Sequence, residues 1–307
     1  MAKGFAGTSK WRKGSVFRDD AKSRTPAVAA RSRAEEHRLV AAARAGDAAA
    51  LRRLLTIVSR PAFRYGMTFC RDRHDAEEIA QDVLASLVRS LSRYRGEGTL
   101  STWAYTVARH ACVRHRRRSR QAAVSLEDWR DGNGAEPPDR DPASDPVGRL
   151  ERREVREAVA AALRALPEHL REAVVLRDVE GLSAREAARV LRVTERALKS
   201  RLHRARMALR ARLQPLVTGE DVARPGRGCP DIARSWSLNL EGEVSPSLCA
   251  RLEEHVRRCP ECAATCRTMR TTLRQCRLLR TKRLPAAAKK ALAAAAAASR
   301  RTGAARG

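Results

Sequence analysis

Four residues toward the C-terminal end of the chain have the types and spacing of metal ligands. His255, Cys259 and Cys262 form an H-x-x-x-C-x-x-C pattern, and Cys229 lies upstream of them. His255 and Cys259 are four residues apart, so a helix would place both on one face, and Pro260 can turn the chain so that Cys262 points back toward them. A Cys3His set is one that Zn2+ favours in structural sites, and a segment this small would gain much of its folding energy from the metal. We therefore expect a zinc site here.

The alternative interpretation of these thiols is that they are redox-active or inert. The N-terminus lacks the apolar core of a signal peptide, so the protein is expected to be cytoplasmic, and a reducing cytosol disfavours structural disulfides. The chain has eight cysteines, of which three are among the expected metal ligands. Cys70 and Cys112 are expected in a helical core. The remaining three are expected to be additional sensor thiols or buried residues: Cys249, Cys266 and Cys276.

A second pattern suits recognition of duplex DNA. Gly181 is suited to end one helix, Ser183 and Glu186 form a capping box that opens the next, and Thr194 caps a longer basic helix. Two short helices joined in this way predict a helix-turn-helix, whose second helix enters a major groove.

The polar face of that longer helix is cationic. Its apolar residues recur every three or four positions, which leaves Arg and Lys outward, where they can read guanine edges or neutralise phosphates. Residues near the start of a recognition helix lie nearest the bases, so base contacts are expected from Arg196, Lys199 and Ser200. Contacts nearer the DNA backbone are expected from Arg201, His203, Arg204 and Arg206. The alternative is an ordinary helical pair whose arginines are only solvated.

Two further features lie nearer the N-terminus. Asp75, Glu78 and Asp82 share one face of a predicted amphipathic helix, either as a solvated strip or as a docking site for a basic partner. Downstream, Tyr94, Trp103 and Tyr105 lie beside a cluster of arginines, a combination that suits single-stranded DNA. For Trp103, packing in a helical core is the alternative.

The composition indicates how these residues are positioned. Only 4% of the residues are aromatic, and strand-like runs of β-branched residues are missing, so we expect an all-α fold. A net charge of +28 favours a polyanionic partner, with nucleic acid as the first candidate. No membrane partner is expected, because no run of about 18 apolar residues occurs.

The 307 residues divide into several predicted segments. A helix break is expected at Arg60-Pro61 inside the first of the three helical blocks. In chain order the segments are a basic disordered arm (1–33), the first block (34–118), an acidic linker (119–148), the second block (149–217), the third, cysteine-bearing block (218–280) and an Ala/Lys/Arg-rich low-complexity tail (281–307).

Two of these blocks resemble one family. LPEHLREAVVLRDVEGLSAREAARVLRVTERALKSRLHRARMALRARL resembles the minus-35-reading domain of extracytoplasmic-function sigma factors, and the segment from DAEEIAQDVLASLVRSL to HRRRSR resembles the first domain of the same family. The resemblance implies a subunit that directs core RNA polymerase to promoter DNA. One departure is Arg192, where the family's turn commonly has Gly.

The resemblance also implies roles for residues of the first block. The helix that starts at Asp75 would bind the polymerase, through a set that comprises Asp75, Glu78, Gln81 and Asp82. Tyr94 lies in the loop 93–102 that would hold a flipped base of the minus-10 element, and His110 stands where the family often has an Asn that helps to read it. Phosphates near the melting point would be held by Arg109, Arg114, Arg116 and Arg117.

The third block looks like a zinc-binding anti-sigma module, through NLEGEVSPSLCARLEEHVRRCPEC. Because it lies on the same chain, it is expected to sense metal or oxidant and to change sigma activity in cis by contacting the sigma domains. Two other interpretations are a stand-alone helix-turn-helix regulator with a metal-binding domain and a metal-sensing scaffold. An enzyme is not expected, because we find no phosphate-binding Gly loop, Ser-His-Asp set or paired carboxylates.

Overall fold

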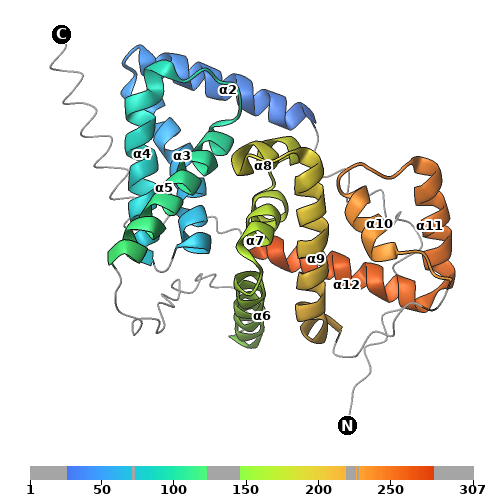
Figure 1. Cartoon of the computed structure of the whole chain (residues 1–307). Helices are drawn as coiled ribbons and strands as arrows, with labels where there is room; N and C mark the ends of the chain where they lie inside the picture. The colour runs from blue at the N-terminus through green and yellow to red at the C-terminus, as the bar shows by residue number, and fades with distance from the viewer. Residues whose placement is uncertain (1–25, 71–72, 123–145, 219–225, 227, 280–307) are drawn as a thin grey trace.

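The computed structural model describes residues 26–70, 73–122, 146–218, 226 and 228–279, which form helices joined by turns (Figure 1). These residues contain no strand, so the predicted all-α class is confirmed. None of the described helices has an apolar stretch long enough to cross a bilayer. Most of the predicted arm and linker and all of the predicted tail lie outside the described residues.

The first block consists of helices that bury a shared apolar face. They are α2 (Pro26–Arg44), α3 (Ala48–Phe69), α4 (Arg73–Ser90), a 3-10 turn η1 (Leu91–Arg93) and α5 (Leu100–Ala122). Asp47 caps α3 by accepting hydrogen bonds from the backbone N–H groups of Ala49 and Ala50. α3 and α4 cross closely because Gly66 has no side chain: a Cβ there would lie 2.7 Å from the Cα of Ala76. The close crossing holds α4 firmly on the block.

Two predictions for this block are wrong in detail. α3 runs unbroken through Pro61, where a break was expected. Proline removes one backbone hydrogen bond, but Val58 and Ala62 beside it are fully buried, and this packing keeps the two halves of the helix in line. α2 begins at Pro26, inside the predicted arm, since proline is well suited to the first position of a helix.

The second block contains the predicted helix-turn-helix. Its elements are α6 (Pro146–Arg164), α7 (Glu168–Val174), a π-helical turn η2 (Val175–Val179), α8 (Ala184–Leu191) and α9 (Glu195–Thr218). α5 and α6 both extend into the predicted linker. The capping box of Ser183 and Glu186 is present, Thr194 accepts from the backbone N–H of Ala197, and Gly181 has φ +82°. The caps predicted from the sequence are thus confirmed.

The turn of this motif contains Arg192 in the left-handed conformation, with φ 55° and ψ 48°. A side chain there brings Cβ close to the following carbonyl, at a cost of about 1–2 kcal/mol. Arg192→Gly should remove this cost and, after the greater chain entropy of Gly is subtracted, stabilise the protein by about 0.5 kcal/mol. The measurement is denaturant unfolding of the full chain.

Arg185→Gly is the matched control, because Arg185 is an exposed residue of the neighbouring helix α8. There the same exchange should lower stability by about 1 kcal/mol, since Gly is a poor helix former. Equal losses in both variants would mean that the Arg192 backbone is not strained.

The third block has a small core of its own. It consists of α10 (Ile232–Asn239), α11 (Pro246–Arg258) and α12 (Pro260–Leu278). Trp236 is 1% exposed at the centre of this core. α12 also crosses α9 and reaches α6, so that Cys276 is buried in the core shared by the first two blocks (Figure 1). The third block is therefore packed onto the helix-turn-helix.

Candidate metal centre and nucleic-acid interface

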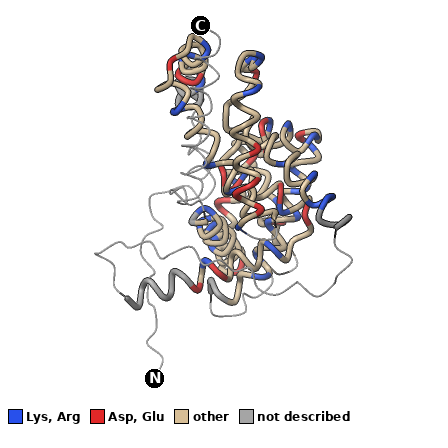
Figure 2. Tube along the Cα trace, turned by 90° about the vertical axis from the view of Figure 1, so that its left-hand side faces the viewer, with Lys and Arg blue, Asp and Glu red and all other residues tan. Residues whose placement is uncertain are grey.

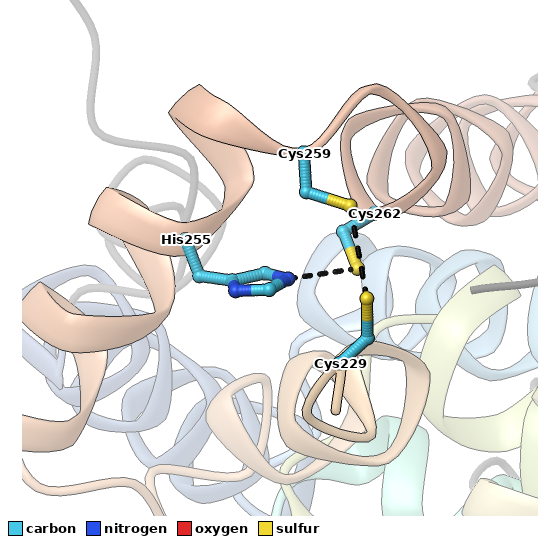
Figure 3. A group of neighbouring side chains, drawn as sticks. All are labelled: Cys229, His255, Cys259 and Cys262. Atoms are coloured by element: carbon cyan, nitrogen blue, oxygen red, sulfur yellow. Dashed lines mark hydrogen bonds between the residues drawn. The ribbon is translucent and has the colours of Figure 1, made fainter. Parts of the chain in front are cut away.

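The structure brings together the four predicted metal ligands (Figure 3). Cys229 precedes α10, His255 lies in the last turn of α11, Cys259 joins α11 to α12, and Cys262 lies in the first turn of α12. Their ligand atoms are all within 4.8 Å of one another. The Sγ atoms of Cys229 and Cys259 are 3.8 Å apart, and Nε2 of His255 is 3.2 Å from Sγ of Cys262.

This donor set fits a metal ion. With Zn–S bonds of about 2.3 Å, two sulfur ligands of a tetrahedral site lie about 3.8 Å apart, which agrees with the separation of Cys229 and Cys259. Burial and the two neighbouring thiols raise the pKa of Cys262, so this sulfur keeps its proton unless a cation favours the thiolate. Three thiols and one imidazole suit a soft or borderline cation.

The other cysteines of the third block are not part of this cluster. Cys249 donates a hydrogen bond to Oδ1 of Asn239 at 3.4 Å. Cys266 and Cys276 are buried, and burial raises the pKa of Cys276 to about 12. Both therefore serve in packing.

The predicted DNA-reading residues of α9 fall into two groups. Arg196, Ser200 and Arg204 are exposed, and Arg201 is partly exposed. Lys199 forms an ion pair with Glu243 of the third block. The pKa of His203 is lowered by burial and by the charges of nearby arginines, so its ring is neutral near pH 7. The third block thus covers one side of α9.

Arg206 was expected to face outward, and this prediction is wrong. The residue is 1% exposed. Its guanidinium donates to both carboxylate oxygens of Asp178 at 2.8 and 2.9 Å, to Glu241 at 2.7 Å and to the carbonyl oxygen of Ser237 at 3.0 Å. Arg206 lies four positions after the buried Leu202 and three before the buried Leu209, so helical spacing places it beside the apolar stripe of α9. There Asp178 of η2, α10 and the turn after α10 pack on it.

Glu241 is the centre of this contact. Its side chain is 1% exposed and accepts hydrogen bonds from Arg206 and, at 2.8 Å, from Arg177. Arg177 also donates to the carbonyl oxygens of Leu182 and Leu240. Figure 2 shows basic and acidic positions interspersed over the described trace. Acidic groups of the third block are therefore paired with cations of the helix-turn-helix.

Several basic residues of the first block are paired in the same way with the second block. Arg109 donates to Glu172 at 2.8 Å and Arg116 to Glu168 at 2.6 Å, both glutamates being on α7. Arg116 lowers the pKa of Glu168 by hydrogen bonding to its carboxylate. By contrast, Arg114 and Arg117 are exposed. Only part of the predicted phosphate-binding set is thus open to solvent.

The aromatic residues also differ in their surroundings. Tyr105 is 2% exposed and donates to Glu180, so it belongs to the core, whereas Trp103 is partly buried against that core. Tyr94 is partly buried, and burial raises its pKa to about 12, so its hydroxyl stays protonated and donates to the carbonyl oxygen of Gly98. His110 is partly exposed, and burial together with nearby arginines lowers its pKa.

The acidic face of α4 is largely open. Glu78, Gln81 and Asp82 are exposed. Asp75 is an exception, because its carboxylate lies 2.7 Å from Nε2 of His115 on α5 and its side chain is 13% exposed. Asp75 is therefore better placed to hold α4 on α5 than to contact a partner.

Comparisons with known proteins agree with the sequence patterns. Family models described as "Sigma-70 region 2", "Sigma-70, region 4" and "Putative zinc-finger" match residues 52–122, 156–209 and 229–263. The RNA polymerase sigma-H factor of Pseudomonas aeruginosa is 30% identical over 193 residues, 60% of this chain and 96% of that protein. The ECF RNA polymerase sigma factor SigM of Mycobacterium tuberculosis is 33% identical over 195 residues, 63% of this chain and 91% of that protein.

The chain belongs to the ECF sigma factors of RNA polymerase. A solved sigma factor from Bartonella quintana, in complex with an anti-sigma factor, is 23% identical with a TM-score of 0.42, covering 52% of this chain and 94% of that one. Because both sigma domains are matched, the alternative of a stand-alone helix-turn-helix regulator is wrong. This sigma factor directs core RNA polymerase to promoter DNA.

Sequence reasoning missed the acidic partners of this sigma factor's basic residues. They were not singled out because an acidic residue on a helix is usually solvated. A signal was nevertheless present, since Asp178 and Glu180 alternate with apolar residues in the run VVLRDVEG, where the buried face of a helix is expected to continue. The partners are Glu168, Glu172, Asp178, Glu180, Glu241 and Glu243.

Glu180 links the two sigma domains most directly. Its carboxylate, 3% exposed, accepts three hydrogen bonds from Arg64 at 2.8, 3.0 and 2.6 Å and one from Tyr105. Glu180→Ala should lower stability by about 3 kcal/mol, because it leaves a mostly buried guanidinium without its partner. In thermal unfolding this corresponds to a loss of about 6–12 °C. Glu97→Ala, at an exposed position, removes the same charge and should have little effect; equal shifts would show that the contact is not stabilising.

Proposed function

We propose that this sigma factor holds Zn2+ in its third block and that this block restrains promoter recognition in cis by covering α9. The observation that carries the proposal is the burial of Arg206, a residue of the recognition helix, between Asp178 and Glu241. A DNA phosphate cannot reach a guanidinium that is 1% exposed. Duplex DNA and the third block therefore compete for one side of α9.

The chemistry of the covering surface supports this competition. Glu241 and Glu243 bring carboxylates to Arg206 and Lys199, where a bound duplex would bring phosphates. Both kinds of anion accept charge-assisted hydrogen bonds from these cations. The third block acts in this scheme as a substitute for the DNA backbone.

The DNA- and polymerase-contacting residues follow from the predicted roles and their exposure. At the minus-35 element, Arg196, Lys199 and Ser200 read bases, and Arg201, His203 and Arg204 hold the backbone. At the minus-10 element, Tyr94 and His110 contact bases and phosphates are held by Arg109, Arg114, Arg116 and Arg117. Arg109 and Arg116 must first leave Glu172 and Glu168. The polymerase contacts Glu78, Gln81 and Asp82, with Asp75 supporting them from its pair with His115.

Cys229, His255, Cys259 and Cys262 would hold the metal, which when bound would supply a structural cross-link between the three helices. All four positions of a tetrahedral ion would be filled by protein, so the site is structural or sensory rather than catalytic. We assign the protein no enzymatic activity of its own and place its action in the cytoplasm, where its polymerase partner works.

The test is run-off transcription with reconstituted core polymerase and the zinc-loaded full chain. We expect the chain to bind core enzyme and to initiate weakly, and we expect initiation to rise when a chelator removes the metal. Parallel reactions with copper and with peroxide would identify the stimulus. Failure to bind core enzyme would contradict the polymerase contacts, whereas initiation that a chelator leaves unchanged would contradict control by the metal.

A further inference from the structure

Two cysteines of the first block lie closer together than van der Waals packing alone requires. The Sγ atoms of Cys70 and Cys112 are 3.0 Å apart, and both residues are free thiols. Non-bonded carbon atoms make their best contact at about 3.5–4.0 Å, and sulfur is larger than carbon. A covalent S–S bond measures about 2.0 Å, so an approach of about 1 Å would complete it.

We propose that Cys70 and Cys112 form an oxidisable dithiol that closes to a disulfide. This site is separate from the metal centre, and it does not depend on the control proposed for the third block. In a reducing cytosol such a bond forms transiently, as in redox-sensing proteins. The two residues come from different helices, so the bond would cross-link the end of α3 to the middle of α5.

The two thiols differ in a way that assigns their roles. Cys70 follows the last residue of α3 and is partly exposed, so a small oxidant can reach it. Cys112 is 1% exposed, and its hydrogen bond to Cys70 together with its burial raises its pKa. Cys70 is therefore the thiol that is oxidised first, and Cys112 is the thiol that resolves the product.

Hydrogen peroxide, or another small peroxide, supplies the oxidising equivalents. The Cys70 thiolate attacks one peroxide oxygen, the O–O bond breaks, and Cys70 becomes a sulfenic acid as hydroxide leaves. The Cys112 sulfur then attacks the Cys70 sulfur, the S–O bond breaks, and the hydroxyl leaves as water with the Cys112 proton. In total, two thiols lose two electrons and two protons, and one peroxide becomes two waters.

The bond would close a ring around the elements expected to act in initiation. Cys70 and Cys112 are 42 positions apart, and the chain between them includes α4, η1 and the loop with Tyr94. One turn beyond Cys112, His115 already joins α5 to Asp75 at the start of α4. Because a cross-link restricts the unfolded chain, the oxidised first block should resist unfolding more strongly than the reduced one.

The experiment treats the zinc-loaded full chain with hydrogen peroxide, blocks the remaining thiols with an alkylating reagent and maps the peptides by mass spectrometry. We expect one cross-linked peptide pair containing Cys70 and Cys112, reversed by a thiol reductant. The pair should persist in Cys249→Ser, which removes a thiol outside both sites, and disappear in Cys112→Ser, where Cys70 should carry a sulfenic or sulfinic acid instead.

A second measurement needs no variant. Hydrogen exchange of α3 and α5 should be at least several-fold slower in the oxidised chain than in the reduced chain, with metal content unchanged. The proposal is overturned if the wild-type chain yields Cys112 entirely as the alkylated thiol after peroxide treatment. It is also overturned if Cys70 pairs instead with a cysteine of the metal centre.

Discussion

Glu241→Ala is expected to raise the affinity of the full chain for duplex DNA by about 10- to 100-fold. The Glu241 carboxylate receives hydrogen bonds from Arg206 and Arg177, and all three side chains are at least 93% buried. Removing one partner of such a group costs about 3–5 kcal/mol, and each 1.4 kcal/mol is a factor of ten. The loss destabilises the state in which the third block is docked on α9. It does not affect the undocked state, because there the arginines are exposed to water. We expect the change in free energy to be smaller than about 3–5 kcal/mol, since Asp178 still pairs with Arg206.

The measurement is fluorescence anisotropy with a labelled duplex over a range of salt concentrations. Undocking of the third block frees Lys199 from Glu243, whereas Arg206 keeps its pair with Asp178. One phosphate contact is thus added, and the slope of log affinity against log salt should steepen by about 1. Glu254→Ala is the matched control, because it makes the same change in net charge on α11, away from α9. If the control gains as much affinity as Glu241→Ala, the effect is one of overall charge and the occlusion of α9 is refuted.

Cys259→Ser or Cys262→Ser should abolish metal binding and unfold α10 and α11. Among the described residues of the third block, its own apolar cluster contains eight buried residues, which is too few to stabilise an independent fold. Metal analysis should find about one zinc per wild-type chain and almost none in either variant, because each variant leaves three of the four ligands. Hydrogen exchange of α10 and α11 should become fast, while α3 and α5 stay protected.

Cys249→Ser serves as the control for this prediction, because Cys249 lies in the same block and donates to Asn239 rather than joining the ligand set. It should retain the metal and the slow exchange. The metal-free variants should also bind duplex DNA as tightly as Glu241→Ala. If a variant loses the metal but does not gain affinity for DNA, the metal does not control DNA binding. If a variant keeps the metal, the assignment of the four ligands is wrong.

Much of the helix-turn-helix could be predicted because its signals are local. Ser183 and Glu186 cap α8 through contacts between residues three positions apart. Gly181 adopts a positive φ, which Gly allows because it has no Cβ. The metal ligands were predictable for a related reason, since a soft donor set at short spacing has few other uses. Their convergence still needed Cys229, which the fold carries to the other three from outside the motif.

The burial and the ion-pair partners of individual charged residues were not predictable from such local signals. Arg204 and Arg206 lie two positions apart on one helix, yet Arg204 is exposed and Arg206 is 1% exposed. Asp75 was grouped with Glu78 and Asp82 by spacing. Asp75 and Glu78 both lie against His115, at 2.7 and 3.5 Å, but the side chain of Asp75 is 13% exposed and that of Glu78 is 49% exposed. In each case the difference comes from a helix distant in the chain.

The sequence alone determined an all-α fold with a helix-turn-helix and a Cys3His cluster, because periodicity, caps and ligand spacing act over a few residues. The sigma-factor family came from the resemblance of two segments to known sigma domains. Only the tertiary structure decided which cations remain open to DNA and which are held by Glu172, Glu180 and Glu241. The physical reason is that the energy of a charge depends on its burial and its partner, and both are set by packing between helices far apart in the chain. The proximity of Cys70 and Cys112 was decided in the same way.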